Sequence, residues 1–195
     1  MPTRILILQG HPDGRTDHLC HALAAHYRRG AEDAGHRVEV LDIASLDVPL
    51  LRSQRDWQEG APPEALARAQ RAIAACDHLV LVFPLWLGDM PALVKAFLEQ
   101  VLRPGFAFAY VEGNPLGRKG LAGRSARVIV TMGMPAAVYR HLYRAHSVKS
   151  LERNILGFVG FAPVRETLIG SVEGLDGAAR DRWFARLARL GAAAR

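Results

Sequence analysis

The fold is decided by residues 78–103, which read HLVLVFPLWLGDMPALVKAFLEQVLR. Residues 78–84 are almost uninterruptedly apolar, which is typical of a parallel strand that is buried on both faces. Residues 90–103 carry apolar side chains at helical spacing, and Pro91 is tolerated in the first turn of a helix. This stretch therefore predicts a buried strand that leads through a tight turn into a helix.

The same alternation of strand and helix runs along the rest of the chain. Apolar runs predict further strands at residues 4–10, 37–43, 126–132 and 164–170, and helical periodicity covers residues 18–35, 64–75, most of 136–160, and 177–190. Alternating units of this kind imply an α/β fold, a doubly wound five-stranded parallel sheet with helices on both faces. A length of 195 residues fits one domain, so we expect residues 1–195 to form a single domain.

The composition indicates a soluble globular protein, since 50% of the residues are hydrophobic and 23% are charged. No apolar run approaches the ~20 residues that span a bilayer, and the N-terminus lacks a signal sequence, so a cytoplasmic protein is expected. The only cysteines, Cys20 and Cys76, are too few for a disulfide framework and are expected to be reduced thiols. No metal site is predicted.

The formal net charge of +6 raises the question of a nucleic-acid or anionic membrane partner. The arginines are interleaved with acids along helical stretches, and no run of five basic residues occurs. Solvated helix faces account for this pattern better than a polyanion site. We therefore expect no nucleic-acid partner and no integral membrane segment.

Ligands of doubly wound sheets bind outside the carboxyl ends of the strands, where the strand order reverses. Three loops follow strands there: GHPDGRTDHLC at residues 10–20, PLWLGDM at 84–90 and TMGMPAAVY at 131–139. The first contains neither GxGxxG nor GxxxxGK[ST], which excludes the dinucleotide fingerprint and the Walker P-loop.

The first loop presents cationic side chains beside the start of a predicted helix. His11, Arg15, Thr16 and His18 flank this helix N-terminus, whose free N–H groups and positive dipole end favour an anion. Phosphate is the simplest ligand. The alternative is ordinary capping by Thr16 or Asp17 with solvated histidines.

The other two loops offer groups suited to a planar ligand. Trp86 and Leu87 provide an apolar wall after the third strand, although a lone tryptophan in a turn also serves as a lid over the core or as a subunit contact. Gly133 and Met134 offer backbone N–H groups near Tyr139. The three features fall on neighbouring strand ends.

These loops carry a resemblance to a known family. GHP at residues 10–12, PLWLGDMPALVKAFLEQVLRPGFAF at 84–108 and TMGMPAAVY at 131–139 resemble the flavodoxin-like NAD(P)H:quinone reductases, which include regulatory flavoproteins of potassium efflux systems. The similarity extends to about residue 162, and its middle motif is the most specific. It implies a flavin cofactor, FMN or FAD, with NAD(P)H as electron donor, and a homodimer with shared active sites.

The resemblance also implies a role for individual residues. Tyr139 matches a tyrosine that hydrogen-bonds the flavin edge, and its usual histidine partner falls on Ala145, with His146 next to it. Phe106 and Phe108 match residues that line the substrate pocket from the second subunit. The implied flavin-binding residues are His11, His18, Leu19 and Cys20 in the first loop, Pro84, Leu85, Trp86 and Leu87 in the second, and Thr131, Met132, Gly133 and Met134 in the third.

The first loop departs from the family pattern. It is two residues longer than usual, and Asp17 and His18 replace a small hydroxyl residue and an apolar residue, which leaves FMN and FAD both open. The hydroxyl-rich phosphate loop of electron-transfer flavodoxins is absent, which argues against a one-electron shuttle. Cys20 stands at a helix start that favours a reactive thiol, but a packed core cysteine is the preferred interpretation.

The expected activity is two-electron hydride transfer from NAD(P)H through the flavin to a quinone or a similar planar acceptor, with azo and nitroaromatic compounds as variants. The flavin supplies the chemistry and the protein supplies placement and electrostatics. Two alternatives remain at this stage: a flavin-binding regulatory subunit of a membrane transporter, and a nucleotide-binding module without catalysis.

Overall fold

The computed structural model describes residues 1–15 and 17–195, apart from the side chains of residues 114–116. Thr16, one of the expected capping residues, therefore lies outside the described residues. Five parallel strands form one sheet, as the sequence predicts, and their order is β2-β1-β3-β6-β7. Their bounds are Arg4–Gln9 for β1, Arg37–Asp42 for β2, His78–Pro84 for β3, Ser125–Thr131 for β6 and Val164–Ile169 for β7.

The strand order reverses between β1 and β3. The chain passes from β1 to β2 on one side of the sheet and then adds β3 on the other side, so the carboxyl ends of β1 and β3 flank the crevice. All seven residues of β3 are buried, which agrees with its continuous apolar sequence. The Gly10 N–H donates to the carbonyl of Val82 over 2.7 Å and continues the pairing beyond β1.

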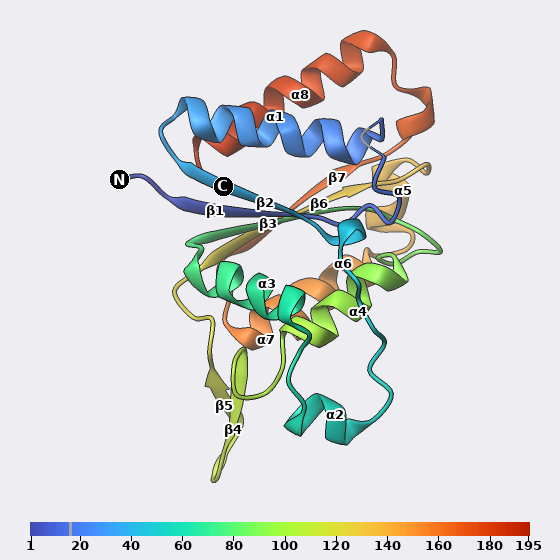
Figure 1. Cartoon of the computed structure of the whole chain (residues 1–195). Helices are drawn as coiled ribbons and strands as arrows, with labels where there is room; N and C mark the ends of the chain where they lie inside the picture. Colours follow the sequence, from blue (N-terminus) through green and yellow to red (C-terminus); the bar gives the residue numbers. More distant parts are fainter. Residues whose placement is uncertain (16) are drawn as a thin grey trace.

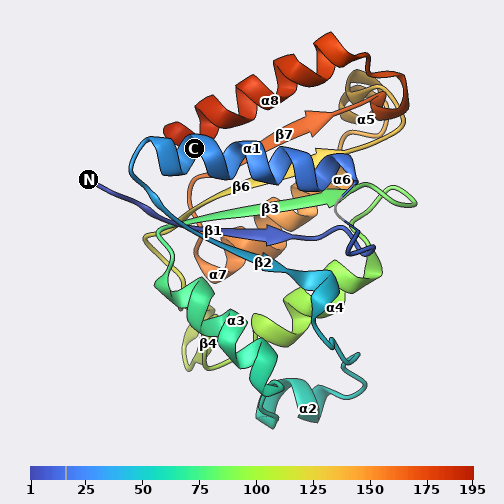
Figure 2. The same cartoon turned by 45° about the horizontal axis from the view of Figure 1, so that its top comes forward.

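Helices cover both faces of the sheet (Figure 1, Figure 2). Helices α1 (Leu19–Asp33) and α8 (Gly177–Ala192) lie side by side on one face, while α3 (Glu64–Ala75) and α4 (Ala92–Val101) lie on the other. Each face has its own buried cluster. Alternate residues of β1 divide between them, because Ile5 and Ile7 pack towards α1 and Leu6 and Leu8 pack on the opposite face.

The segment predicted as mostly helical over residues 136–160 is divided into short pieces. They are α5 (Ala136–His141), α6 (His146–Ser150), the π-helix η2 (Leu151–Leu156) and α7 (Gly157–Val159). Arg144 and Ala145 have φ angles of 55° and 49°, and this left-handed backbone interrupts the helix after α5. The break brings the first turn of α6 back over α5.

Several small elements in the connecting segments were not predicted from the sequence. They are a β-hairpin formed by β4 (Phe108–Val111) and β5 (Asn114–Lys119), the helix α2 (Gln54–Glu59), and the 3₁₀ turns η1 (Ile43–Ser45) and η3 (Val172–Gly174). The hairpin extends away from the sheet (Figure 1). Ser53 caps the N-terminus of α2, and its side chain accepts a hydrogen bond from the Asp56 N–H over 3.0 Å.

Hydrogen bonds join the segment of residues 46–62, which carries α2, to the end of α4. Arg103 is 5% exposed, and its guanidinium donates to the carbonyls of Gly60, at 2.8 Å, and of Asp56. The Gln100 amide donates to the Pro49 carbonyl over 2.8 Å. Two polar side chains of the α4 end therefore bind three backbone carbonyls of the irregular segment, of which that of Asp56 also accepts from the Gly60 N–H.

Among residues 1–15 and 17–195, no helix is both long and apolar enough to cross a membrane.

Candidate functional site

The three loops meet at the carboxyl edge of the sheet. Contacts link every pair of loops: the rings of His11 and Trp86 have centroids 6.0 Å apart, and the Cys20 sulfur lies 3.3 Å from the Thr131 hydroxyl. The Leu85 N–H donates to the Thr131 carbonyl over 2.7 Å. Residues from three distant parts of the sequence therefore form one site at the reversal of strand order.

Three histidines gather in the first loop and at the start of α1. His11 and His18 stack with their ring centroids 3.8 Å apart, and His21 lies 6.0 Å from His11 and 6.1 Å from His18. Burial lowers the pKa of His11. Sequence reasoning missed His21, although its position three residues after His18 on a helix places both rings on one face.

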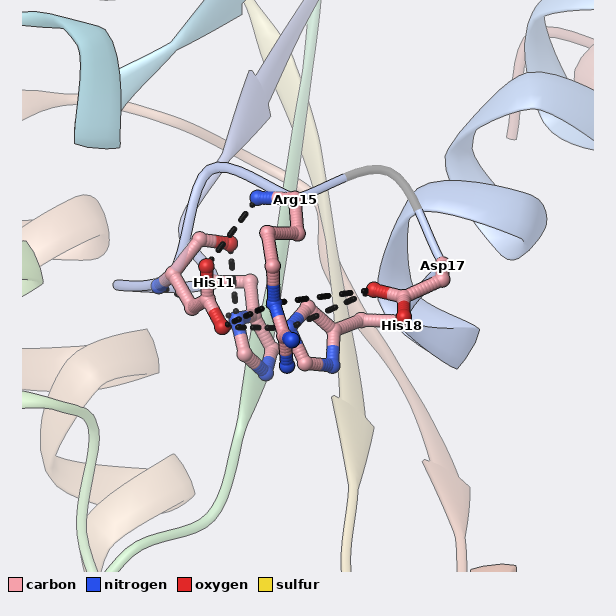
Figure 3. Close-up of polar contacts among 5 residues, drawn as sticks. His11, Arg15, Asp17 and His18 are labelled. Carbon is pink, nitrogen blue, oxygen red and sulfur yellow. Dashed lines mark hydrogen bonds and ion pairs between the residues drawn. The ribbon is translucent and has the colours of Figure 1, made fainter.

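An ionic cluster occupies the same loop (Figure 3). The Asp13 carboxylate accepts hydrogen bonds from Nε2 of His18 at 3.0 Å and from Nε of Arg15 at 2.8 Å. These hydrogen bonds, that of His18 foremost, lower the pKa of Asp13 well below its usual range. Asp17 contributes longer ion pairs, at 4.0 Å to Arg15 and 3.8 Å to His18. The cations expected to attract phosphate are thus paired within the loop.

The N-terminus of α1 carries no capping side chain among the described residues. His18 occupies the N-cap position without a hydrogen bond from its side chain to the helix, and no acidic residue lies in the first turn. The Asp17 carboxylate pairs with Arg15 and His18 rather than capping. Backbone N–H groups at the positive end of the helix dipole are therefore left for an anion.

Trp86 begins a tight turn that projects from the end of β3. Its N–H donates to the Asp89 carbonyl over 2.9 Å, and the Asp89 N–H returns a bond of 3.0 Å. Leu87 and Gly88 have φ angles of 48° and 81°, which is the type I′ geometry that the twist of paired strands favours. The Trp86 side chain is 51% exposed, so it is not a buried lid over the core.

The backbone N–H groups of the third loop differ in whether they are already hydrogen-bonded. Thr131 and Met132 are buried, and the Met132 N–H is bound to the Ile169 carbonyl at 2.9 Å. Gly133 is exposed and Met134 is partly buried, and their N–H groups make no hydrogen bond within the part of the chain that the structure describes. Of the four residues expected along the flavin edge, these two have amides free for a ligand.

Tyr139 lies in α5 and is buried, with 2% of its surface exposed. Its hydroxyl has no hydrogen-bond partner among the described residues. Burial raises the pKa of Tyr139, and the nearby Val148 N–H and Ser147 hydroxyl act in the opposite direction. His146 is exposed and makes no hydrogen bond to Tyr139 in the described structure. Its role as the partner of Tyr139 stays a prediction, and the polar side chain beside the phenol is that of Ser147.

The remaining predicted residues are Cys20, expected near the flavin, and the pair Phe106 and Phe108, expected in the substrate pocket of the second subunit. Cys20 is buried, and burial raises its pKa to about 11, which agrees with a packed core thiol. Phe106 and Phe108 lie away from Trp86 within one chain. The Phe108 ring packs 5.8 Å from that of Trp57 and 4.8 Å from that of Phe158, beside a cavity of about 600 Å³ that Phe106 does not line.

The polar groups of the site fit a flavin nucleotide. Buried atoms that lack a hydrogen-bond partner among the described residues include Nε2 of Gln9, both ring nitrogens of His21 and the Tyr139 hydroxyl. Gln9 ends β1 and His21 lies in the first turn of α1, so the two residues flank the loop expected to hold the phosphate. In native proteins such unpaired groups are rare and call for a ligand or water. Within the described ranges, no group of three His, Cys, Asp or Glu side chains has the geometry to hold a metal ion.

Comparisons with known proteins agree with this geometry. An FMN-dependent NADH:quinone oxidoreductase of Shewanella loihica is 31% identical over 159 residues, which cover 76% of this chain and 77% of the relative. An uncharacterized NAD(P)H oxidoreductase of Haemophilus influenzae is 25% identical over 179 residues, with 90% and 87% of the two chains covered.

The NAD(P)H:quinone oxidoreductase structure from Methanothermobacter marburgensis superposes with a TM-score of 0.81 at 24% identity, over 98% of this chain and 96% of that one, and supports the fold. The profile of the family described as "Flavodoxin-like fold" matches residues 3–190, which confirms the resemblance expected from the sequence. The chain belongs to this flavodoxin-like fold family.

Proposed function

We propose that the protein is a flavin-dependent oxidoreductase that passes two electrons from NAD(P)H to a quinone or a similar planar acceptor. The observation that carries this proposal is the meeting of three loops around a half-exposed indole, beside a helix N-terminus that no side chain of the described residues caps. The sequence relationship to an FMN-dependent NADH:quinone oxidoreductase points to the same activity.

FMN is the flavin that we propose. When bound, it supplies hydride acceptance and hydride donation, while the protein supplies position and charge. The α1 N-terminus, His11 and His18 would hold the phosphate, and Trp86 with Leu87 would lie along the ring system. Pro84, Leu85, Leu19 and Cys20 would support these contacts from the strand end and the first turn of α1.

The free amides of Gly133 and Met134 would stabilise negative charge on the flavin. Tyr139 would donate its hydroxyl proton into the site, because burial raises its pKa and keeps the phenol protonated. No described side chain needs to act as a nucleophile, since the buried Cys20 thiol has a pKa of about 11.

We further propose a homodimer in which each site is completed by the second copy. Large apolar side chains stand exposed on the Trp86 turn, on the β4–β5 hairpin and on α7, namely Trp86, Leu87, Tyr110, Val111 and Phe158. Such a surface indicates an interface. Phe106 and Phe108 would then serve the partner's site. A monomeric mass by light scattering at micromolar concentration would contradict the dimer.

The absorbance spectrum of the purified protein tests the cofactor directly. We expect flavin bands in the near ultraviolet and the blue that survive desalting after FMN is added, and weaker retention of FAD. Anaerobic bleaching of the bound flavin by NADH or NADPH, followed by recovery on addition of a benzoquinone, tests the activity. Protein that retains neither flavin would overturn the proposal.

A further inference from the structure

The turn that carries Trp86 projects from the end of β3 with its tip in solvent. Residues 86–89 are exposed, whereas Leu85 and Met90 on either side of them are partly buried and pack against the core. A cavity of about 440 Å³ is lined by residues of this turn, of α4 and of the segment formed by α6 and η2. The tip of the turn therefore depends on a few individual contacts rather than on burial in the core.

One of these contacts is a hydrogen bond between two walls of the cavity. The Ser147 hydroxyl, in the first turn of α6, donates to Oδ1 of Asp89, and both residues line the cavity. The same oxygen accepts from the Met90 N–H at 2.6 Å. Asp89 also exchanges backbone hydrogen bonds of 2.9 and 3.0 Å with Trp86. Ser147 is therefore linked to Trp86 through a single intermediate residue.

The α6 end of this link is anchored in the core. Val148 and Leu151, which follow Ser147 in the chain, are buried in the hydrophobic cluster on this face of the sheet. On the other side, Ala145 is buried as well, and its N–H donates to the Tyr139 carbonyl over 3.0 Å. The Ser147 hydroxyl is thus presented from a backbone that is fixed on both sides, whereas Asp89 belongs to the exposed tip.

The cation that lines the same cavity does not replace this link. Lys95 pairs with Glu99 one turn along α4, and within the described residues Ser147 is the side chain that hydrogen-bonds the Asp89 carboxylate. A hydrogen bond to an ionised carboxylate is stronger than one between neutral groups. Because Asp89 is exposed, we expect an effect of a few-fold rather than of orders of magnitude.

We propose that Ser147 is a positioning residue for the flavin, because it holds the Trp86 turn, through Asp89, where the indole meets the ring system. The inference rests on the proposed function. The His11 ring already meets the indole edge-on, with the two centroids 6.0 Å apart, so the turn is contacted both from the first loop and from α6. A turn that is ordered before binding loses less conformational entropy when the flavin arrives, and the flavin binds more tightly.

Flavin binding by matched variants tests this role. We expect Ser147→Ala to raise the dissociation constant of FMN, measured by fluorescence quenching, about three- to fivefold. Ser147→Thr keeps the hydroxyl and should restore wild-type binding. Ser150→Ala removes a hydroxyl that lines the same cavity but accepts from Asn154 at 3.2 Å instead of reaching Asp89, and this variant should bind FMN as wild type does.

A double-mutant cycle shows whether Ser147 acts through the indole. If it does, Ser147→Ala should cause no further loss of FMN affinity in a protein that already carries Trp86→Ala. Losses that add in full would mean that Ser147 contributes independently of Trp86, and would overturn the inference.

The order of the turn can also be measured without flavin. The sequence has three tryptophans, so Trp57→Phe and Trp183→Phe together leave Trp86 as the sole indole fluorophore. In this background, Ser147→Ala should lower the fluorescence anisotropy of Trp86 and increase its quenching by acrylamide, whereas unchanged anisotropy would overturn the inference. The two possible failures are distinct. Wild-type protein that binds no FMN would refute the proposed function, whereas wild type that binds FMN no more tightly than Ser147→Ala would refute only the role of Ser147.

Discussion

The imidazole rings of His11 and His18 stack with their centroids 3.8 Å apart and an interplanar angle of 16°. Asp13 fixes this arrangement, because its carboxylate accepts from Nε2 of His18 at 3.0 Å and its N–H donates to Nδ1 of His11 at 3.2 Å. Asp13 thus holds two side chains that the proposed function assigns to a phosphate, one through its carboxylate and one through its backbone N–H.

We expect Asp13→Asn to tighten FMN binding about threefold at low ionic strength, because the change frees Arg15 and His18 from a competing anion. Quenching of flavin fluorescence gives the dissociation constant. Asp181→Asn makes the same charge change at an exposed position of α8 and should leave the constant unaltered. Weaker binding by the Asp13 variant would mean that this carboxylate orients the histidines for the ligand.

Replacement of Trp86 by alanine is expected to weaken FMN retention about tenfold, since the half-exposed indole is the aromatic surface proposed to lie along the flavin ring system. Trp86→Phe should recover much of the loss. Trp183→Ala, on α8, is the matched control because it removes an indole from a helix outside the site. The role of the Trp86 ring fails if the alanine variant holds FMN as tightly as wild type after gel filtration.

Acid should destabilise the protein through His78. This residue is 1% exposed, its Nε2 has no partner among the described residues, and burial lowers its pKa to about 4. The unfolded chain binds a proton at an ordinary histidine pKa near 6.5, so stability is complete above that value and falls as the pH drops towards 4. The loss reaches roughly 3 kcal/mol at the lower limit.

Urea unfolding at pH 7.5 and pH 5 measures this dependence. His78→Gln cannot titrate, so the decrease between the two pH values should be smaller in the variant, whatever its absolute stability. His26, which is partly buried and stacks on Phe184 at 4.3 Å, gives a control substitution to glutamine. An identical pH dependence in wild type and His78→Gln would show that other groups carry the effect.

Arg103→Met should release the segment of residues 46–62 from the end of α4. The variant keeps the length of the side chain but leaves the carbonyls of Asp56 and Gly60 without their buried donor, at a cost of about 2 kcal/mol in the free energy of unfolding. Limited proteolysis should cut within this segment before the rest of the chain. Arg52→Met changes an exposed arginine of the same segment, and this variant should resist proteolysis as well as the wild type does.

The regular part of the fold could be predicted because its signals are local. Residues 78–84 and 64–75 have the predicted bounds, since a continuous apolar run and a helical stripe each identify one kind of element. The break at Arg144 and Ala145 could not be predicted, because neither is a glycine, the residue that adopts a left-handed backbone most readily. Short elements such as α2 depend on a distant residue, Arg103, that no local pattern reveals.

The site was predictable in its location but not in its internal contacts. The rule that ligands lie at strand ends, together with the family resemblance, identified the three loops that meet in the structure. Contacts across the loops depend on side-chain placement in three dimensions. The pairing of His18 with Asp13 and the tie between Ser147 and Asp89 are of this kind, since neither spacing repeats any familiar motif.

The packing of α8 against α1 has a consequence for biosynthesis. Leu187, near the end of the chain, is buried in the same cluster as Ile5 and Ile7 of the first strand. A nascent chain on the ribosome therefore exposes the apolar surface that α8 covers in this cluster until α8 emerges. Chaperone binding to that surface, and degradation of chains that stall before α8, are the expected cellular cost of joining the two ends of the sequence in one core.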